Sequence, residues 1–310
     1  MKLKDKPELT QIGGQAVIEG VMMRSPKCVA IAVRKSNGEI VVKKEPFVSL
    51  VKKHRFLNFP ILRGAIALVE TLYIGMKALS FSADVLIQEE EEGEKKQSEQ
   101  KICEENPHQK SDFFTSLWLV ITLVIGVVLA LFLFFYLPLL IADFIGVKQG
   151  FLFNLTSGMI RISIFLVYLW IITLWKSMRR IFEYHGAEHK SIYALESGEK
   201  LEVKNVRKYS THHPRCGTSF LLIVMLVSIA VYIFLGRPQT VTDRLTRLLF
   251  VPLIAGISYE IIKLSGKKRL SKLMKIFLAP GLWLQRLTTK EPDDEQLKVA
   301  IVALEKCLEE

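Results

Sequence analysis

Cysteine is scarce in this sequence, and its placement does not indicate disulfide bonds. The 310 residues contain four cysteines, at Cys28, Cys103, Cys216 and Cys307. They show no paired spacing, which excludes a disulfide framework and favours a reducing compartment. The first residues also lack an apolar stretch, so we expect no cleavable signal peptide.

Charge is missing from long parts of the chain. Residues 113–142 contain no Asp, Glu, Lys or Arg, and half of the whole chain is hydrophobic. A stretch of that length is enough to span a bilayer. Three further apolar stretches cover residues 151–175, 220–236 and 248–264. We therefore predict a mainly α-helical, polytopic membrane protein with about four spans.

The formal net charge of +11 is compatible with two kinds of anionic partner, nucleic acid and lipid. Most of the Lys and Arg residues lie next to the apolar stretches, so we expect membrane lipid and no nucleic acid. The sequence does not identify protein partners, and it leaves open whether copies of the chain form a homo-oligomer.

The positions of the basic residues predict the orientation in the membrane. Lys176, Arg179 and Arg180 follow the second apolar stretch, and several Lys and Arg follow the fourth. Because basic flanks stay on the cytoplasmic side, we expect a multi-pass protein of the plasma membrane with both termini cytoplasmic. The three Arg within residues 237–247 then lie on the outer side, in mild conflict with this orientation.

Two charged residues interrupt the apolar stretches. Arg161 lies in the second and Glu260 in the fourth. A charge at the centre of a bilayer costs roughly 2.5–3.5 kcal/mol on insertion scales, so both should face inward and find partners. They can satisfy this need by pairing with each other. Such a pair is structural, or it lines a transport path.

The N-terminal part, residues 1–60, predicts a small β-hairpin unit preceded by a glycine-rich loop. Residues 28–34 and 39–43 have the composition of strands, and Asn37-Gly38 between them is a strong hairpin signal. The glycine-rich segment 13–26 contains Glu19 and Arg24. We expect these two to form an ion pair that holds the loop, the alternative being that they reach a functional site.

A long helix is predicted for residues 61–87. Its charges recur every seven residues and form a narrow stripe on an otherwise apolar surface, at Arg63, Glu70, Lys77 and Asp84. We interpret it as an amphipathic interfacial helix, with a polar groove beside a site as the alternative. Residues 88–112 are predicted to be a disordered acidic linker.

Residues 113–310 form the predicted membrane domain, which carries a cytoplasmic His/Cys site. Near its end, residues 276–284 are too short to span a bilayer, and Pro280-Gly281 should break the helix there. Whether residues 61–87 and 276–284 enter the bilayer stays open. Asp293 or Asp294 should cap a last helix that runs to about Cys307.

The first half of the site is His185-Gly-Ala-Glu188-His189. On a helix, residues four apart lie on the same face one turn apart, which suits two ligands of one metal ion. The string His-x-x-Glu-His is also the pattern of inverted zinc peptidases, in which the Glu activates metal-bound water. We predict His185 and His189 as ligands and Glu188 as the catalytic base.

The second half is His212-His213-Pro-Arg215-Cys216. Pro214 limits helix formation, so these residues should lie on a turn that leads into the third span. One or two of His212, His213 and Cys216 would complete a tetrahedral site for a divalent metal of Zn²⁺ type. Lys190 and Arg215 would bind an anionic substrate such as a phosphate or a lipid headgroup.

Two alternatives to a metal site remain open. Cys216 and a histidine can form a nucleophilic pair, which Arg215 would favour by stabilising a thiolate. The histidines can also be structural, bonding to backbone and lipid phosphate at the membrane surface.

With these motifs together, the chain resembles the YqhQ-like family of bacterial membrane proteins, assigned to domain of unknown function 1385. The resemblance covers nearly the whole chain and rests on GGQAVIEGVMMRSP at 13–26, Arg63-Gly64, YHGAEHK at 184–190, NVR at 205–207, HPRCGTSF at 213–220, AGISYE at 255–260 and PGLWLQRLTTKEPDD at 280–294. It implies a metal-dependent enzyme with no established substrate. It carries over as motif positions His185, Glu188, His189, His213 and Cys216, and it ranks His212 below His213.

The sequence therefore predicts a metal-dependent integral membrane enzyme, a hydrolase acting at the cytoplasmic membrane face. The ligands would be His185, His189, His213 and Cys216, with Glu188 as base and His212, Glu19, Arg24, Arg161 and Glu260 as accessory residues. The alternative is a non-enzymatic protein, either a transporter or a metal-sensing scaffold, with Arg161 and Glu260 in its core.

Overall fold

The computed structural model describes residues 12–98, 112–265 and 272–309. The described residues form two compact units. The first, called here the sheet unit, takes in residues up to Glu89, residues 169–227 and residues from Phe250 onward. The second, the helical unit, takes in residues 90–168 and 228–249. The predicted His/Cys site lies wholly within the sheet unit.

The sheet unit contains a four-stranded antiparallel sheet in the order β1-β2-β3-β4. Its strands are β1 (Gly13–Val17), β2 (Gly20–Arg24), β3 (Cys28–Arg34) and β4 (Ile40–Pro46). The predicted hairpin is β3 and β4, and Gly38 in its turn has a φ of 87°. The glycine-rich segment, expected to be a loop, instead forms β1 and β2. At Gly20 a Cβ would stand 2.3 Å from the carbonyl oxygen of Ala32, so glycine here permits close strand pairing.

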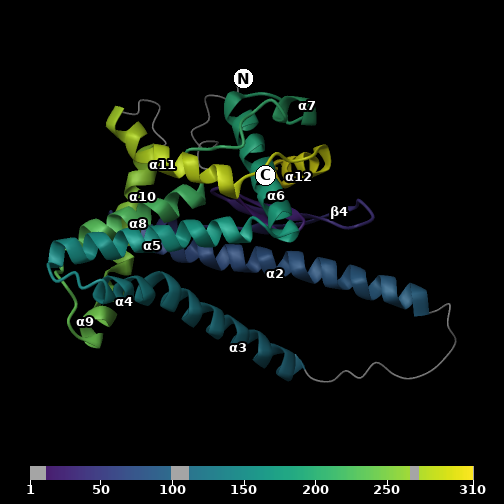
Figure 1. Cartoon of the computed structure of the whole chain (residues 1–310). Coiled ribbons are helices and arrows are strands. Elements are labelled where there is room, and N and C mark those ends of the chain that lie inside the picture. The colour runs from purple at the N-terminus through teal and green to yellow at the C-terminus, as the bar shows by residue number, and fades with distance from the viewer. Residues whose placement is uncertain (1–11, 99–111, 266–271, 310) are drawn as a thin grey trace. The chain divides into compact units, whose positions relative to one another are not determined.

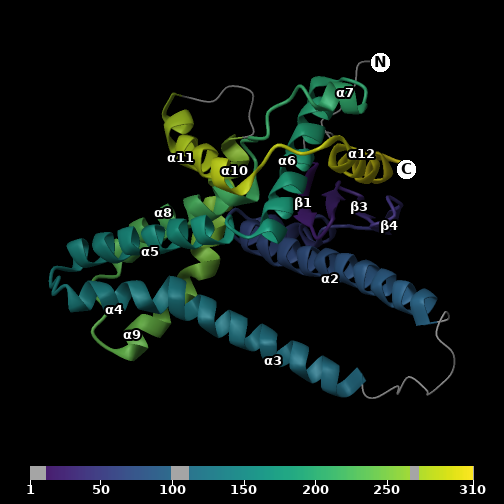
Figure 2. The same cartoon turned by 45° about the vertical axis from the view of Figure 1, so that its right-hand side comes forward.

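Both faces of the sheet are covered by helices. Alternate strand residues point to opposite faces. Met22 and Ile31 pack with Ile74 of α2 (Leu62–Ser98). Met23 and Ala30 join the core formed with α6 (Lys176–Ser197) and α12 (Asp294–Leu308). Figures 1 and 2 show α2 on one side of the sheet and α6 and α12 on the other.

Three of the four charged residues in the stripe of α2 contact other parts of the sheet unit. Arg63 donates two hydrogen bonds to the Glu260 carboxylate, at 2.6 and 2.5 Å. Glu70 accepts from Arg24 at 3.1 Å, and Lys77 pairs with Glu45. The opposite face of α2 exposes large apolar side chains, among them Val69, Leu72, Tyr73 and Met76. The helix therefore turns Arg63 and Glu70 inward, whereas Asp84 at the far end of the stripe is exposed.

The expected Glu19–Arg24 ion pair is wrong. Glu19 instead pairs with Arg180 of α6, and its backbone adopts a φ of 50° in the turn between β1 and β2. Arg24 pairs with Glu70 and stacks over the Phe47 ring at 4.3 Å from its centroid. These contacts join the glycine-rich strands to helices far away in the sequence.

The structure also corrects the expected Arg161–Glu260 pair, because each residue has partners in its own unit. Glu260 of α10 (Val251–Ser265) binds Arg63. Arg161 of α5 (Gly150–Ile172) donates to the Phe134 carbonyl and to Ser228 Oγ, both at 2.9 Å. Phe134 lies in a π-helical turn, η4 (Phe132–Tyr136), where the backbone hydrogen-bond register shifts. Arg161 is buried, as a charge in an apolar helix should be.

Five helical segments of the described chain are long and apolar enough to cross a membrane. Four of them, residues 121–144, 150–172, 217–234 and 241–264, correspond to the predicted spans. The first segment contains the end of α3 (Asp112–Leu131), η4 and α4 (Leu137–Phe144). The second is α5, and the third is α8 (Gly217–Phe234). The fourth contains α9 (Val241–Thr246), η5 (Arg247–Phe250) and α10. The fifth, Leu62–Glu90, is the helix that the sequence assigned to the interface. The fold is thus that of a helical membrane protein with a small N-terminal sheet.

Three predicted boundaries can be compared with the observed helices. α2 runs to Ser98, so the first part of the predicted linker is helical, and residues 99–111 of that linker lie outside the described residues. α11 (Lys272–Thr288) continues through Pro280, where a break was expected, and Gly281 packs closely against Ser219. α12 begins after Asp293, whose side chain accepts from the Gln296 backbone in a capping box, as predicted.

Candidate metal centre

The two histidines of the first half lie on one face of α6. His185 and His189 are one helical turn apart, and their ring centroids are 4.5 Å apart. Glu188 and His189 are almost fully buried, whereas His185 is partly exposed. The prediction that these histidines share one helix face is confirmed by this geometry.

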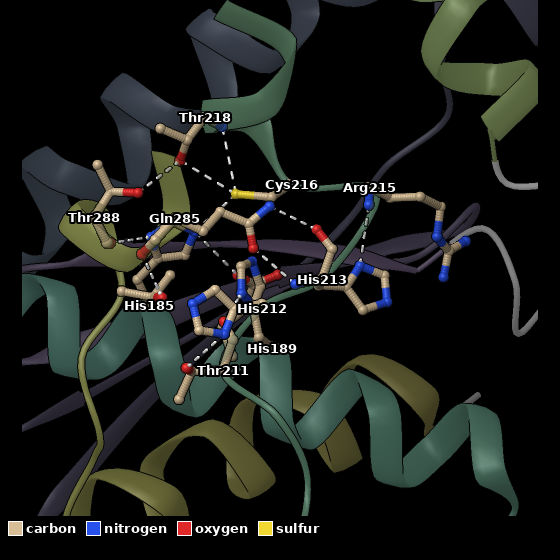
Figure 3. A network of polar contacts seen from close by, with 12 residues as sticks. His185, His189, Thr211, His212, His213, Arg215, Cys216, Thr218, Gln285 and Thr288 are labelled. Carbon is tan, nitrogen blue, oxygen red and sulfur yellow. Dashed lines mark hydrogen bonds and ion pairs between the residues drawn. The ribbon is translucent and has the colours of Figure 1, made fainter. Parts of the chain in front are cut away.

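Cys216 reaches the histidines from a loop that precedes α8. α6 ends at Ser197 and is capped by Gly198, which has a φ of 75°; the chain then forms only the short α7 (Val203–Val206) before α8 begins at Gly217. Gln285 of α11 fixes this loop, since its amide accepts from the His213 N–H at 2.7 Å and donates to the His213 carbonyl at 2.8 Å. The Cys216 Sγ then lies 3.2 Å from His185 Nε2 (Figure 3).

Backbone carbonyls set the tautomer of both histidines. His185 Nδ1 lies 2.8 Å from the Thr288 carbonyl oxygen, and His189 Nδ1 lies 2.5 Å from the Thr211 carbonyl oxygen. A carbonyl only accepts, so each Nδ1 must carry the proton. When such a ring is neutral, its Nε2 lone pair is available to another partner, which is the arrangement that orients metal-bound histidines.

The ligand atoms of His185, His189 and Cys216 all lie within 4.8 Å of one another. Two imidazole nitrogens and a thiolate sulfur are donors that suit Zn²⁺. Around a tetrahedral Zn²⁺, a nitrogen and a sulfur ligand are separated by about 3.5 Å, given the usual bond lengths. The observed 3.2 Å between His185 Nε2 and Cys216 Sγ is close to this value. The donor set and its spacing therefore fit a divalent metal.

The electrostatics of the cluster favour a thiolate. Burial opposes ionisation of Cys216, but the neighbouring His185 and His189 lower its pKa well below the ordinary value. For His185, burial acts to lower the pKa, yet Cys216 and Glu188 raise it to about 9. The Thr218 N–H also points at the sulfur from 3.4 Å, at the positive end of α8. A ligand that must bind as an anion is thus stabilised in advance.

Glu188 lies beside the candidate ligands. Its Oε2 is 3.9 Å from His185 Nε2 and 3.7 Å from His189 Nε2. Strand β1 closes the other side, because a Cβ at Gly14 would stand 2.6 Å from Glu188 Cγ. Only glycine at position 14 lets the carboxylate stay where it is. A ligand bound by the two Nε2 atoms would therefore lie close enough to Glu188 for a hydrogen bond, either direct or through one water molecule.

His213 and His212 are turned away from this cluster. His213 Nδ1 accepts from the Arg215 N–H at 3.3 Å, so its proton sits on Nε2, which lies 3.5 Å from Glu196. Burial lowers the pKa of His213 to about 4, so the ring is neutral. His212 Nδ1 lies near the hydroxyls of Ser210 and Thr211. Of the three predicted second-half residues, the structure groups only Cys216 with the two α6 histidines.

The two predicted anion-binding residues have different surroundings. Lys190 is buried, and its ammonium donates to the Arg207 carbonyl at 2.9 Å and pairs with Glu291. Arg215 pairs with Glu196 and stays partly exposed. Lys190 therefore ties the chain after α11 to α6, whereas Arg215 remains at a surface that a ligand can reach.

Sequence reasoning missed the residues that orient the ligands. Thr211 and Thr288 act through backbone carbonyls, which leave no mark on side-chain type, and Gln285 acts through its amide. One signal in the sequence did point to such a contact: Gly186 lies inside the helical motif, where glycine lowers helix stability. Its Cβ would stand 2.0 Å from the Lys290 carbonyl oxygen, so glycine permits the segment after α11 to lie against α6.

Comparisons with known proteins cover the whole site. The family described as "Protein of unknown function (DUF1385)" matches residues 59–310. A protein of Bacillus subtilis (strain 168), the uncharacterized protein YqhQ, is 33% identical over 307 residues, covering 96% of this chain and 92% of that protein. No solved structure matches the chain. The family match contains every residue of the candidate metal centre.

Proposed function

The chain belongs to the DUF1385 family of unknown function, and we propose that it is a metal-dependent hydrolase held in the membrane. One observation carries this proposal. Two histidines, each anchored by a backbone carbonyl at Nδ1, direct their Nε2 atoms to the same small region as the Cys216 sulfur. A buried carboxylate, Glu188, lies within 4 Å of both nitrogens.

The roles follow from these contacts. His185, His189 and Cys216 would hold a divalent ion such as Zn²⁺, which when bound supplies a Lewis acid and lowers the pKa of a bound water. Glu188 would accept the proton of the attacking water and return it to the leaving group. Gln285 keeps Cys216 in place, and Thr211 and Thr288 keep the imidazoles in the binding tautomer. His213 would stabilise the loop before α8 and would not bind the ion.

The packing of α2 supports a position of the four-stranded sheet at the membrane surface. One face of α2 is covered by the sheet, and a sheet with open edges cannot lie in the hydrocarbon core, because its unpaired backbone groups would have no partner. The other face exposes Val69, Leu72, Tyr73 and Met76. We infer that α2 lies along the membrane surface, which leaves four spans and puts both termini on the cytoplasmic side.

A second candidate function uses the same residues without a metal. The 3.2 Å separation of His185 Nε2 and Cys216 Sγ, with His185 oriented by the Thr288 carbonyl, also suits a cysteine nucleophile and its base. Transport through Arg161 and Glu260 stays a prediction that no contact favours, since both side chains already have local partners.

The first experiment measures metal content. Full-length protein purified in detergent, with Zn²⁺ and Mn²⁺ supplied during growth, is analysed by elemental mass spectrometry. We expect close to one equivalent of a divalent metal per chain, because three donors are already oriented. The double variant His185→Ala/His189→Ala should lose it, since two of the three ligands are removed.

The matched control is His212→Ala, which removes a nearby histidine that lies outside the ligand group. It should keep the metal. Folded wild-type protein that contains no metal would overturn the metal-dependent interpretation. Alkylation of Cys216 by iodoacetamide, compared between the wild type and His185→Ala, would then test the cysteine nucleophile.

A further inference from the structure

A cavity of about 740 Å³ lies next to the candidate metal centre within the sheet unit. Its walls come from β1, β2, α2 and α10, and from the chain between β4 and α2. Gly14 lines it and is also the residue that touches Glu188. Arg215, which directly precedes Cys216, lines it as well. Gly14 therefore lies between the cavity and Glu188, the proposed catalytic base.

The charged residues that line the cavity are predominantly cationic. One carboxylate, Glu70, faces five basic residues, namely Arg24, Lys52, Arg63, Arg215 and Lys263. The three arginines each have a carboxylate partner. Within the described chain neither lysine has an ion-pair partner. A cavity with this excess of positive charge suits an anion with several acceptor oxygens, such as a phosphate group.

One segment that lines the cavity has the composition of a membrane-contacting surface. Residues 48–62, which include α1 (Leu50–Lys53) and η3 (Arg55–Asn58), contribute Ser49, Val51, Lys52 and Asn58 to the lining and are called here the entrance segment. Val48, Phe56 and Phe59 in this segment are 63%, 71% and 73% exposed. Lys52 and Lys53 are exposed among them. Exposed aromatic and aliphatic side chains next to lysines are typical of a segment that inserts at the lipid headgroup level.

We propose that this cavity binds the phosphate-bearing headgroup of a membrane lipid, which enters past the entrance segment while its acyl chains stay in the bilayer. The lysines bring the headgroup in, and the arginines, already aligned by their carboxylates, bind its oxygens. That this lipid is the substrate rests on the proposed hydrolase function. The binding itself does not, because no cavity-lining residue belongs to the metal ligand group.

Lipid binding can be measured by native mass spectrometry of the full chain in detergent, titrated with phosphatidylglycerol, diacylglycerol and glycerol 3-phosphate. The first has both phosphate and acyl chains, and each of the others lacks one. We expect the wild type to retain phosphatidylglycerol at least about tenfold more tightly than either.

Two variants test the cavity by different means. Lys52→Gln/Lys263→Gln removes the two lysines of the lining and should weaken phosphatidylglycerol binding at least about tenfold. Ala67→Trp fills the cavity from α2 without a change of charge and should have a similar effect. The matched controls are Lys200→Gln/Lys208→Gln, exposed lysines outside the lining, and Val69→Trp, on the outer face of the same helix. Both should bind as the wild type does.

Three results would overturn the proposal. Glycerol 3-phosphate bound as tightly as phosphatidylglycerol would make the ligand a soluble phosphate ester. Diacylglycerol bound equally well would remove the role of phosphate. If phosphatidylglycerol binding fell equally in the variants and in their controls, the loss would reflect a general effect of surface charge and side-chain size and not the cavity. Selective phosphatidylglycerol binding in a wild type without metal would support the cavity and reject the hydrolase, whereas metal without lipid selectivity would reject the cavity alone.

Discussion

Glu188→Gln is expected to abolish hydrolysis while the metal stays bound. The carboxylate lies 3.7 and 3.9 Å from the two imidazole nitrogens that would hold the ion, so it is placed to take a proton from a water there. Glutamine has the same shape but accepts no proton. Loss of a general base lowers the rate by about 10²- to 10⁴-fold. The ligands themselves are untouched, so the metal content should not change.

Hydrolysis can be followed even while the product is unidentified. The wild type and the variant are reconstituted in vesicles made from bacterial lipid extract and incubated in water enriched in ¹⁸O. Each hydrolytic event places one oxygen of the solvent in a product, which mass spectrometry detects. Elemental analysis of the same samples gives the metal content.

Glu183→Gln is the matched control on the same helix. Glu183 contacts Arg179 and Gln296 and lies outside the ligand cluster, so this variant should keep full activity. Undiminished ¹⁸O incorporation in Glu188→Gln would rule out Glu188 as the base. Loss of the metal in Glu188→Gln would make it a ligand.

The sequence predicted those parts of the site that depend on local spacing. His185 and His189 share a face because α6 is continuous around them, and four residues on a helix make one turn. Pro214 correctly indicated that Cys216 arrives from a turn before α8. The capped last helix is likewise a local signal, since Asp293 and Gln296 satisfy each other within three residues.

Contacts between distant segments could not be predicted in this way. Glu19 and Arg24 are close in sequence and opposite in charge, yet they pair with Arg180 and Glu70. The hairpin of β1 and β2 decides this, because Glu19 lies in its turn, against α6, whereas Arg24 lies at the end of β2, against α2. Pairing by charge alone also failed for Arg161, which finds a backbone carbonyl and a serine hydroxyl instead of a carboxylate.

The choice between His213 and Cys216 shows the same limit within the site. Both lie at suitable spacing in one motif, and sequence reasoning kept both. The direction of each side chain depends on Gln285, a residue of α11 that clamps the backbone of His213 from both sides. With that backbone fixed, the His213 ring turns to Glu196 and the sulfur turns to His185.

Gly186→Ala is expected to destabilise the protein and weaken metal binding, although alanine favours helix over glycine by about 1 kcal/mol. The new Cβ would stand 2.0 Å from the Lys290 carbonyl oxygen, a backbone atom that cannot rotate away. The Lys290 N–H bonds to the Phe182 carbonyl, and the Thr288 carbonyl accepts from His185. Displacing this segment breaks both contacts, and overpacking of this kind costs about 1–3 kcal/mol or more.

Thermal unfolding in detergent and metal titration would measure the two effects of Gly186→Ala separately. Without the Thr288 carbonyl, the His185 ring loses the contact that fixes its tautomer, and loss of such a partner weakens metal affinity about 10- to 100-fold. Gly126→Ala is the matched control, because it is also helical and a Cβ there meets no atom within 4 Å. It should leave both quantities unchanged or raise stability slightly. If Gly186→Ala behaved like this control, the segment after α11 would not be held against α6, and the orientation of His185 would need another cause.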